Sequence, residues 1–181
     1  MFRTGGLICV SLGLVALLAP SDAAAQNGER SGFSFGFGLG PSLVPNPDDE
    51  GVVFKIVPGF EFFDGVDLEI ETGFKRGSSN GVQDGMWPVL LGVRYSLGEL
   101  PVVPFVTLHF GPGVSASNDD GGWYAESTMF GFSLGGGVDY ALGDNYGVGT
   151  ELSYSFFAPI DDWNPATYHF VDLTVEMRFG F

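Results

Sequence analysis

VDLTVEMRFGF, residues 171–181, alternates apolar and polar residues over its whole length. Every second position from Val171 to Phe181 is apolar, and the positions between them hold acidic, basic, threonine or glycine residues. Because successive side chains of a β-strand point to opposite faces, this stretch predicts a strand with one apolar and one polar face.

The same alternation recurs in seven further segments, which brings the number of predicted strands to eight. The other segments are Phe33–Leu39, Val52–Phe62, Val66–Phe74, Trp87–Leu97, Val106–Phe110, Phe130–Leu142 and Val148–Phe156. This pattern predicts an all-β fold, an eight-stranded antiparallel up-and-down β-barrel.

The predicted connections alternate in length. Short turns are expected at 64–65, 98–101 and 143–145. Because the strands before and after the first turn keep the same apolar parity, its loop is expected to have an odd number of residues, most simply Phe63–Gly65 with Gly65 in the left-handed conformation. Long loops are expected at 44–51, 77–85, 114–126 and 158–167. Short turns at one end and long loops at the other are typical of outer-membrane barrels, whose long loops are extracellular.

Charge and composition indicate a membrane barrel. The chain has 22 acidic and 7 basic residues, which disfavours nucleic acid as a partner, yet it is 45% hydrophobic. No charged residue after residue 25 is expected at an apolar position of the eight strands. Since Arg or Lys facing lipid at the midplane costs about 2–4 kcal/mol, this pattern favours a transmembrane barrel. A barrel dissolved in the periplasm is the alternative.

The first residues resemble an export signal. Arg3 precedes an apolar run at 7–19, Pro20 breaks this run, and three alanines end at Ala25. We predict a cleavable signal peptide over residues 1–25 and an outer-membrane β-barrel domain over residues 26–181. The only cysteine, Cys9, lies in the predicted signal, so no disulfide is expected after cleavage.

The inward face of the predicted barrel carries charges and some large apolar residues. The expected lumen charge network consists of Lys55, Glu69, Glu71, Arg94, Glu151, Glu176 and Arg178. Leu90 and Phe105 are also expected inside, so we predict a plugged lumen without a diffusion pore. An ion-pair network that stiffens the barrel is the favoured interpretation, and a proton or ion path through a gated lumen is the alternative.

The sequence predicts no catalytic residue, no cofactor site and no metal site within the barrel. The run Gly135–Gly137 is not followed by a helix, so it does not predict a nucleotide site. Acidic pairs occur in the loops at 48–50, 119–120 and 161–162, where solvated tips are expected and a loop-bound divalent cation is the alternative.

The stretch FGFSLGGGVDY, residues 130–140, resembles the glycine-rich sixth strand of the outer-membrane β-barrel domain family, the eight-stranded, OmpA/OmpX-like porin-family proteins. The turn at 144–145, the strand at 147–154 and the segment at 104–113 also fit, so the resemblance extends over about residues 32–181. It implies that the last strand carries the signal read by the barrel-assembly machinery. The matching residues are Val171, Val175, Met177, Phe179 and Phe181.

The resemblance also implies where catalysis would be found. Family members that act on lipid A use His with Ser, or with Asp and Ser. Here His109, expected inward near the outer end, is followed by Phe110 and Gly111, and His169 by Phe170 and Val171, so neither forms a His-x-Ser pattern. Asp172 lies three residues after His169, a spacing that puts the two on opposite faces of the strand.

The sequence as a whole therefore predicts a non-enzymatic protein of the cell outer membrane of a Gram-negative-type bacterium. Its expected role is in envelope structure or in surface contact through extracellular loops. A small channel or lipid-handling barrel is the first alternative, and a lipid A-modifying enzyme is the second. The expected partners are outer-membrane lipid, the barrel-assembly machinery and a surface partner, and the barrel is expected to be a monomer.

Overall fold

The structure, a computed structural model, describes residues 32–43, 50–79, 82–97, 101–119, 122–143, 145–160 and 167–180. The predicted signal peptide over residues 1–25 lies outside these residues. Within the described part of the chain, no helix has the length and apolar character needed to cross a membrane.

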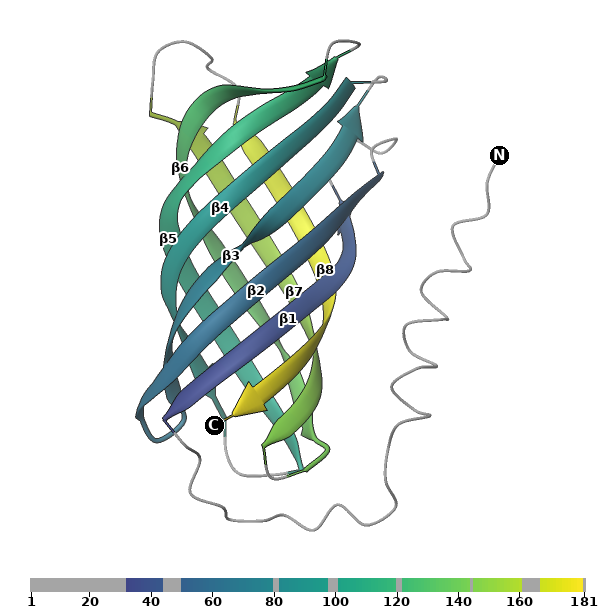
Figure 1. Cartoon of the computed structure of the whole chain (residues 1–181). Coiled ribbons are helices and arrows are strands. Elements are labelled where there is room, and N and C mark those ends of the chain that lie inside the picture. Colours follow the sequence, from purple (N-terminus) through teal and green to yellow (C-terminus); the bar gives the residue numbers. More distant parts are fainter. Residues whose placement is uncertain are drawn as a thin grey trace, which may run out of the picture.

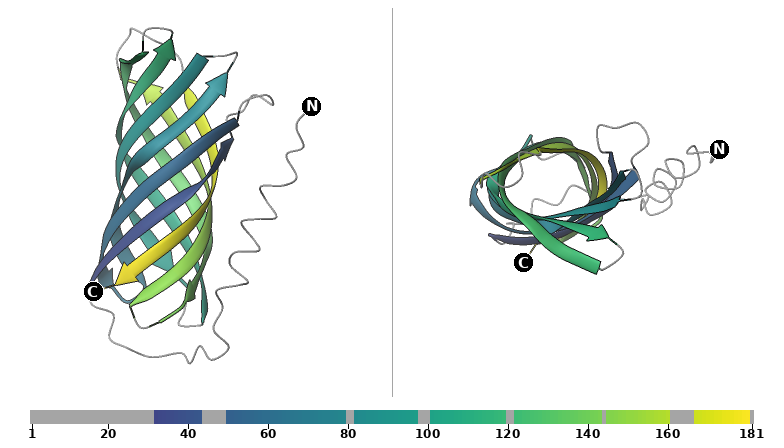
Figure 2. Two further views of the ribbon diagram at one scale, coloured as in Figure 1. Left: turned by 45° about the vertical axis from the view of Figure 1, so that its right-hand side comes forward. Right: turned by 90° about the horizontal axis from the view of Figure 1, so that it is seen from above.

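Eight antiparallel strands form a closed barrel, as the alternation predicted (Figure 1). The strands are β1 (Phe33–Leu43), β2 (Glu50–Phe63), β3 (Val66–Ser79), β4 (Val82–Ser96), β5 (Val102–Asp119), β6 (Gly122–Ala141), β7 (Tyr146–Pro159) and β8 (Tyr168–Gly180). Each strand pairs with the next, and β8 pairs with β1 through contacts such as Phe35 with Phe179. The view along the axis shows a complete ring, so the sheet has no open side over its central height (Figure 2).

The two ends of the barrel differ. At the turn end, the short connections β2–β3, β4–β5 and β6–β7 lie beside the start of β1 and the end of β8, where Ser34 pairs with Gly180. The loop end holds the connections β1–β2, β3–β4, β5–β6 and β7–β8. This is the alternation of ends that the sequence predicted.

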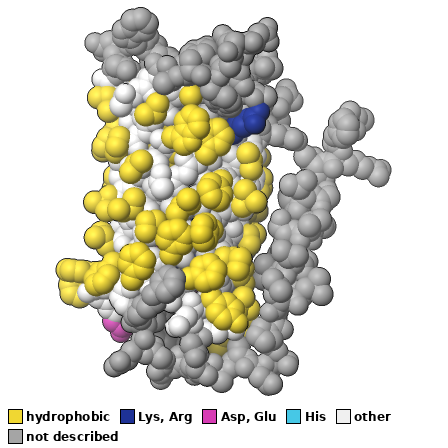
Figure 3. All heavy atoms as spheres, in the orientation of Figure 1, with side chains coloured by type: hydrophobic (Ala, Val, Ile, Leu, Met, Phe, Trp, Pro, Cys, Tyr) yellow, Lys and Arg dark blue, Asp and Glu magenta, His cyan; other side chains and the backbone are white. Residues whose placement is uncertain are grey.

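Alternate side chains divide sharply between the two faces of the sheet. On β4, Leu90 is fully buried inside whereas its neighbour Leu91 is 56% exposed outside. On β7, Glu151 is buried and Leu152 is exposed. Figure 3 shows that hydrophobic side chains cover the middle height of the visible face, and that visible charges lie towards its ends. Exposed apolar residues arranged in this way form a belt suited to lipid.

Two of the four predicted long loops are strands. β3 ends at Ser79 and β4 begins at Val82, while β5 ends at Asp119 and β6 begins at Gly122. The predictions of loops over 77–85 and 114–126 were therefore wrong. Alternation disappears there because the strands leave the apolar belt, but backbone pairing does not depend on apolar side chains and continues.

The β5–β6 hairpin extends beyond its neighbour on one side. β5 and β6 have 18 and 20 residues, whereas β7 has 14. The pairing of β6 with β7 begins at Met129, which lies opposite Pro159, while residues 122–128 of β6 pair with β5. We call residues 114–119 of β5 and 122–128 of β6 the raised hairpin.

Arg76 is a charged residue at an outward position. It pairs with Val52, whose side chain is 44% exposed, and directly paired residues share a face of the sheet. The expectation that every charge avoids the apolar positions is therefore wrong at Arg76. Its position near the loop end accounts for this, because a long basic side chain can reach the headgroups with its charge while its stem contacts apolar surface.

The β2–β3 turn has the predicted left-handed Gly65, but the predicted three-residue loop was wrong because a register irregularity in β2 takes up the extra residue. Gly65 has a φ of 73°, in the left-handed region that favours glycine. The pairing shifts register between Glu61 and Phe63, and this irregularity lets Phe63 pair with Val66 across a two-residue turn at 64–65. The amide of Gly65 also donates a hydrogen bond of 3.2 Å to Glu61 Oε1.

The glycine run of β6 contains a matched pair for testing how closely the strands pack. A Cβ at Gly137 would overlap the carbonyl oxygen of Thr150 and lie 2.7 Å from the ring of Phe105. At Gly136, the nearest atom would be the Phe105 carbonyl oxygen at 3.3 Å. We expect Gly137→Ala to lower the free energy of unfolding by about 1–3 kcal/mol through overpacking, and Gly136→Ala to lower it by less. Urea unfolding in phospholipid vesicles measures both, and equal effects would contradict this packing.

Candidate functional site

The lumen contains a cluster of large apolar side chains in its loop-end half. Met86 and Leu90 come from β4, Met129 from β6, Phe157 from β7 and Phe170 from β8. All are at most 3% exposed and lie inside the barrel, where Phe157 and Phe170 meet edge to face. The predicted inward position of Leu90 is confirmed, and so is that of Phe105, which is buried closer to the turn end.

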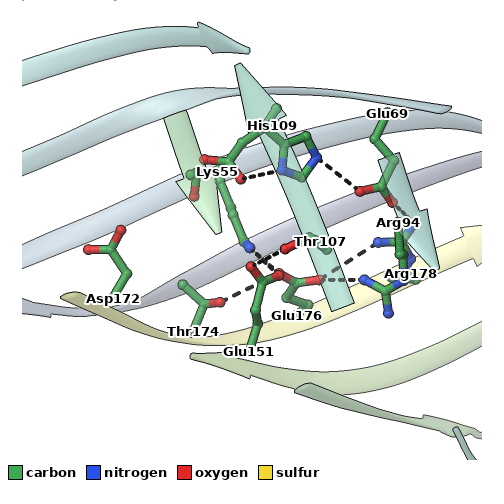
Figure 4. A network of polar contacts seen from close by, with 12 residues as sticks. Lys55, Glu69, Arg94, Thr107, His109, Glu151, Asp172, Thr174, Glu176 and Arg178 are labelled. Carbon is green, nitrogen blue, oxygen red and sulfur yellow. Dashed lines mark hydrogen bonds and ion pairs between the residues drawn. The ribbon is translucent and has the colours of Figure 1, made fainter. Parts of the chain in front are cut away.

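A buried lysine, Lys55, pairs with two glutamates in the middle of the lumen. Lys55 Nζ on β2 donates to Glu151 Oε2 on β7 at 2.8 Å and also forms an ion pair with Glu176 on β8 (Figure 4). The Thr107 hydroxyl donates to the other oxygen of Glu151 at 3.2 Å. Lys55, Glu151 and Glu176 are each at most 4% exposed. A charge buried to this degree is stable only when it is paired and hydrogen-bonded.

A second lysine lies nearer the loop end. Lys75 Nζ contacts Asp172 Oδ2 at 2.6 Å and Ser155 Oγ at 2.7 Å. Asp172 is fully buried and also accepts a hydrogen bond from the Ser42 hydroxyl. Glu71 is farther from Lys75, at 3.8 Å.

Two arginines lie towards the turn end. Arg178 Nη2 donates to Glu69 Oε1 at 2.5 Å, and Arg94 Nη2 donates to Asp139 Oδ2. The guanidinium of Arg94 lies over the ring of Phe105, with Cζ 3.3 Å from the ring centroid. This stacking holds the guanidinium plane in one orientation.

His109 lies between two glutamates inside the barrel. Its Nε2 is 3.3 Å from Glu69 Oε2, and its Nδ1 is 3.8 Å from Glu71 Oε2. The sequence predicted it inward, as found, but near the outer end. It lies instead near the middle of β5, opposite Ser133, because β5 continues beyond its predicted end.

The structure brings all seven residues of the predicted lumen charge network into the barrel. Six of them are at most 4% exposed, and Arg178 lies nearer the turn-end opening. The sequence interpretation omitted several members of the same network, namely Asp67, Lys75, His109, Asp139 and Asp172. The alternation itself could have identified them, because they occupy the same polar positions as the predicted seven.

The second histidine lies on the outer face of β8. His169 Nδ1 is 2.7 Å from the Tyr154 hydroxyl, and its ring packs against Phe156. Asp172 is inside the barrel, on the opposite face of the strand, as the three-residue spacing predicted.

Other predicted sites lie on the outer face or outside the described residues. Val171, Val175, Met177 and Phe179 of the predicted assembly signal share the outward positions of β8, while Phe181 is not among the described residues. Asp48, Asp49, Asp161 and Asp162 and the side chains of Glu50, Asp119 and Asp120 also lie outside what the structure describes, so it does not test a loop-bound cation.

The fold is shared with solved outer-membrane proteins. Neisserial surface protein A is 14% identical, with a TM-score of 0.72 over 85% of this chain and 100% of that one. The N-terminal barrel domain of OprF from Pseudomonas aeruginosa is 12% identical, with a TM-score of 0.58 over 84% and 100%. The attachment invasion locus protein Ail of Yersinia pestis is 15% identical, with a TM-score of 0.52 over 82% and 99%. Identities this low show similarity of fold alone.

Comparison by sequence gives two results. A search of curated proteins finds no match. The model of the outer membrane protein beta-barrel domain family matches residues 10–179, which include all eight strands except the last residue of β8. The closed eight-stranded ring, the apolar belt and this match agree, and they locate the protein in the outer membrane of a Gram-negative bacterium. The chain belongs to the outer membrane protein beta-barrel domain family.

Proposed function

We propose that this protein is a non-enzymatic outer-membrane barrel with a plugged lumen, which serves envelope structure and surface contact through its loop end. The observation that carries this proposal is the filled interior. Large apolar side chains and the Lys75–Asp172 pair occupy the loop-end half of the lumen, and further paired charges occupy its middle and its turn end. In a barrel filled in this way, a ligand or partner can reach side chains only at the two ends, and no continuous pore connects them.

The raised hairpin supports contact at the cell surface. With the short turns on the periplasmic side, as in outer-membrane barrels, the loop end faces the exterior. Residues 122–125 of β6 pair with β5, and within the described residues no other strand pairs with their opposite side. An unpaired strand edge offers backbone donors and acceptors to a partner chain.

A strain lacking the gene tests the two parts of the role separately. It would be complemented with the whole protein or with a form in which Val114 and Thr128, which pair across the ladder, are joined by Asn-Gly. We expect the whole protein to restore both resistance to SDS and adhesion to epithelial cells. We expect the shortened form to restore resistance to SDS alone. Heat-dependent mobility of each form on SDS gels controls for assembly, and a deletion strain with unchanged resistance and adhesion would contradict the proposal.

The alternatives give different results in direct assays. Refolded protein in a planar lipid bilayer is expected to show no steady conductance, because Phe157, Leu90 and their neighbours fill the lumen. Steady openings would favour the small-channel alternative. Mass spectrometry of lipid A from cells with and without the gene is expected to give identical species, and a changed lipid A would favour the enzyme.

Export and assembly are part of the proposal. We expect the signal peptide to be removed after Ala25, which N-terminal sequencing of the membrane-inserted protein measures. We expect recognition by the barrel-assembly machinery to depend on the alternate residues from Val171 to Phe181. Phe179→Ser together with Phe181→Ser should therefore lower the amount of folded protein in the outer membrane, while Ser34→Ala at the same end of the barrel should not.

A further inference from the structure

The turn end of the lumen opens into a pocket of about 140 Å³. Five charged side chains line it: Glu61, Asp67 and Asp139, which are acidic, and Arg94 and Arg178, which are basic. Ser34 on β1 adds a hydroxyl. These six residues come from six different strands, so the pocket exists only in the closed barrel. Neither the side chains that fill the lumen nor the raised hairpin explains this pocket.

Polar atoms without hydrogen-bond partners are concentrated in this pocket. Across the described residues, four buried side-chain atoms have no hydrogen-bond partner, and three of them belong to pocket residues: Ser34 Oγ, Arg94 Nη1 and Asp139 Oδ1. Arg94 is 1% exposed. Since about 90% or more of buried polar groups are hydrogen-bonded, three such atoms at one place leave donors and an acceptor that water or a polar ligand in the pocket would satisfy.

The arrangement of these atoms suggests which groups the molecule carries. Arg94 and Asp139 are joined through Nη2 and Oδ2, so Nη1 remains as a donor and Oδ1 as an acceptor within one ion pair. Arg94 Nη1 is 3.8 Å from Glu176 Oε2, which is beyond hydrogen-bond length. A carboxylate would satisfy the guanidinium, and an ammonium would satisfy the aspartate.

The other pocket charges favour a ligand that carries both signs. Arg178 adds a second cation, and Asp67, 4.0 Å from it, adds a second acid. A phosphate would meet the three acids, and a simple cation would meet the two arginines, so each would be partly repelled. The volume admits roughly ten water-sized groups, which is enough for an amino acid and too little for a nucleotide or a disaccharide.

We propose that the periplasmic mouth of the barrel binds a small zwitterion of amino acid size, with its carboxylate on Arg94 and Arg178 and its ammonium on Asp139 and Asp67. The ring of Phe105 stacks against the Arg94 guanidinium, so this hydrogen-bond donor is held in one orientation before the ligand binds. The site does not depend on the surface role proposed above, because it lies at the opposite end of the barrel.

The test uses the refolded barrel in detergent micelles and NMR titration with four probes. Glycine and diglycine carry both charged groups, acetate carries the carboxylate alone, and methylammonium carries the ammonium alone. We expect saturable shifts with glycine at the amides of Gly147 and Gly180, both of which line the pocket. Acetate and methylammonium should each bind at least about tenfold more weakly, because each forms one of the two charge-assisted contacts. Glycine and diglycine together distinguish a free amino acid from a peptide as the ligand.

Asp139→Asn and Asp64→Asn form the matched pair of variants. Each removes one carboxylate at the turn end, but Asp64 lies in the exposed β2–β3 turn and does not line the pocket. We expect Asp139→Asn to weaken glycine binding at least about tenfold and Asp64→Asn to leave it unchanged. If glycine does not saturate, if acetate binds equally well, or if the two variants bind alike, the proposal is wrong. Should Asp139→Asn fail to fold, glycine shifts in the unmodified protein at residues away from the turn end would overturn it as well.

Discussion

Replacing Lys55 with methionine is expected to lower the free energy of unfolding by about 3–5 kcal/mol. Lys55 is 4% exposed and is the cation between Glu151 and Glu176, whose side chains are buried on β7 and β8. Methionine keeps most of the side-chain volume but leaves two carboxylates close together without that cation. Their repulsion and incomplete solvation inside the barrel account for the size of the effect.

Urea titration of the variant in phospholipid vesicles measures this loss. Arg76→Gln is the control, because it removes one positive charge from the outer face near the loop end, and we expect it to change stability by less than about 1 kcal/mol. Adding Glu151→Gln and Glu176→Gln to Lys55→Met should restore much of the lost stability, because the two carboxylates that paired with Lys55 are then neutral. If Lys55→Met were as stable as the unmodified protein, the ion pairs would have no structural role.

An arginine in place of Leu91 is expected to destabilise the inserted barrel by about 2–4 kcal/mol. Leu91 is 56% exposed and lies midway along β4 between Trp87 and Tyr95, two exposed aromatic residues of the kind that mark membrane interfaces. The guanidinium would therefore lie near the bilayer midplane. In a barrel surrounded by water, the same exposed substitution would change stability by about 0.5 kcal/mol or less.

Leu97→Arg separates the effect of depth from the effect of the substitution itself. Leu97 is 47% exposed and follows the last residue of β4 at the turn end, so its arginine reaches water or headgroups. We expect a change of about 0–1 kcal/mol. Urea unfolding in vesicles compares the two variants, and equal losses at both positions would contradict a lipid belt centred on Leu91.

The raised hairpin shows where reasoning from alternation stops. Residues 114–126 were expected to form a loop because their side chains do not alternate, yet the backbone of residues 114–119 pairs with that of the segment 122–128. The apolar pattern records contact with lipid, so it ends where the membrane ends, whereas a ladder of backbone hydrogen bonds continues into water. The outward position of Arg76 has the same cause, because its strand extends beyond the segment in which charges are excluded from the outer face.

The sequence predicted which charged residues point into the lumen, but it could not predict which of them pair with each other. The alternation directed Lys55, Glu151 and Glu176 inward, but their sequence separation does not say that one lysine contacts both acids. Nor could it place Arg94 over Phe105 or gather Ser34, Arg94 and Asp139 around one pocket. The Lys55 pairs and the pocket join strands distant in sequence, and the contact of Arg94 with Phe105 depends on the register between β4 and β5.

The amino-acid sequence alone determined the number of strands, the face on which most side chains lie and the apolar belt, because these follow from a two-residue period that each strand carries by itself. The tertiary structure alone decided which charges meet, how far β5 and β6 extend and where a pocket remains. The physical reason is ring closure. The register of eight ladders sets the height of every inward side chain relative to those opposite, and no single strand contains that register.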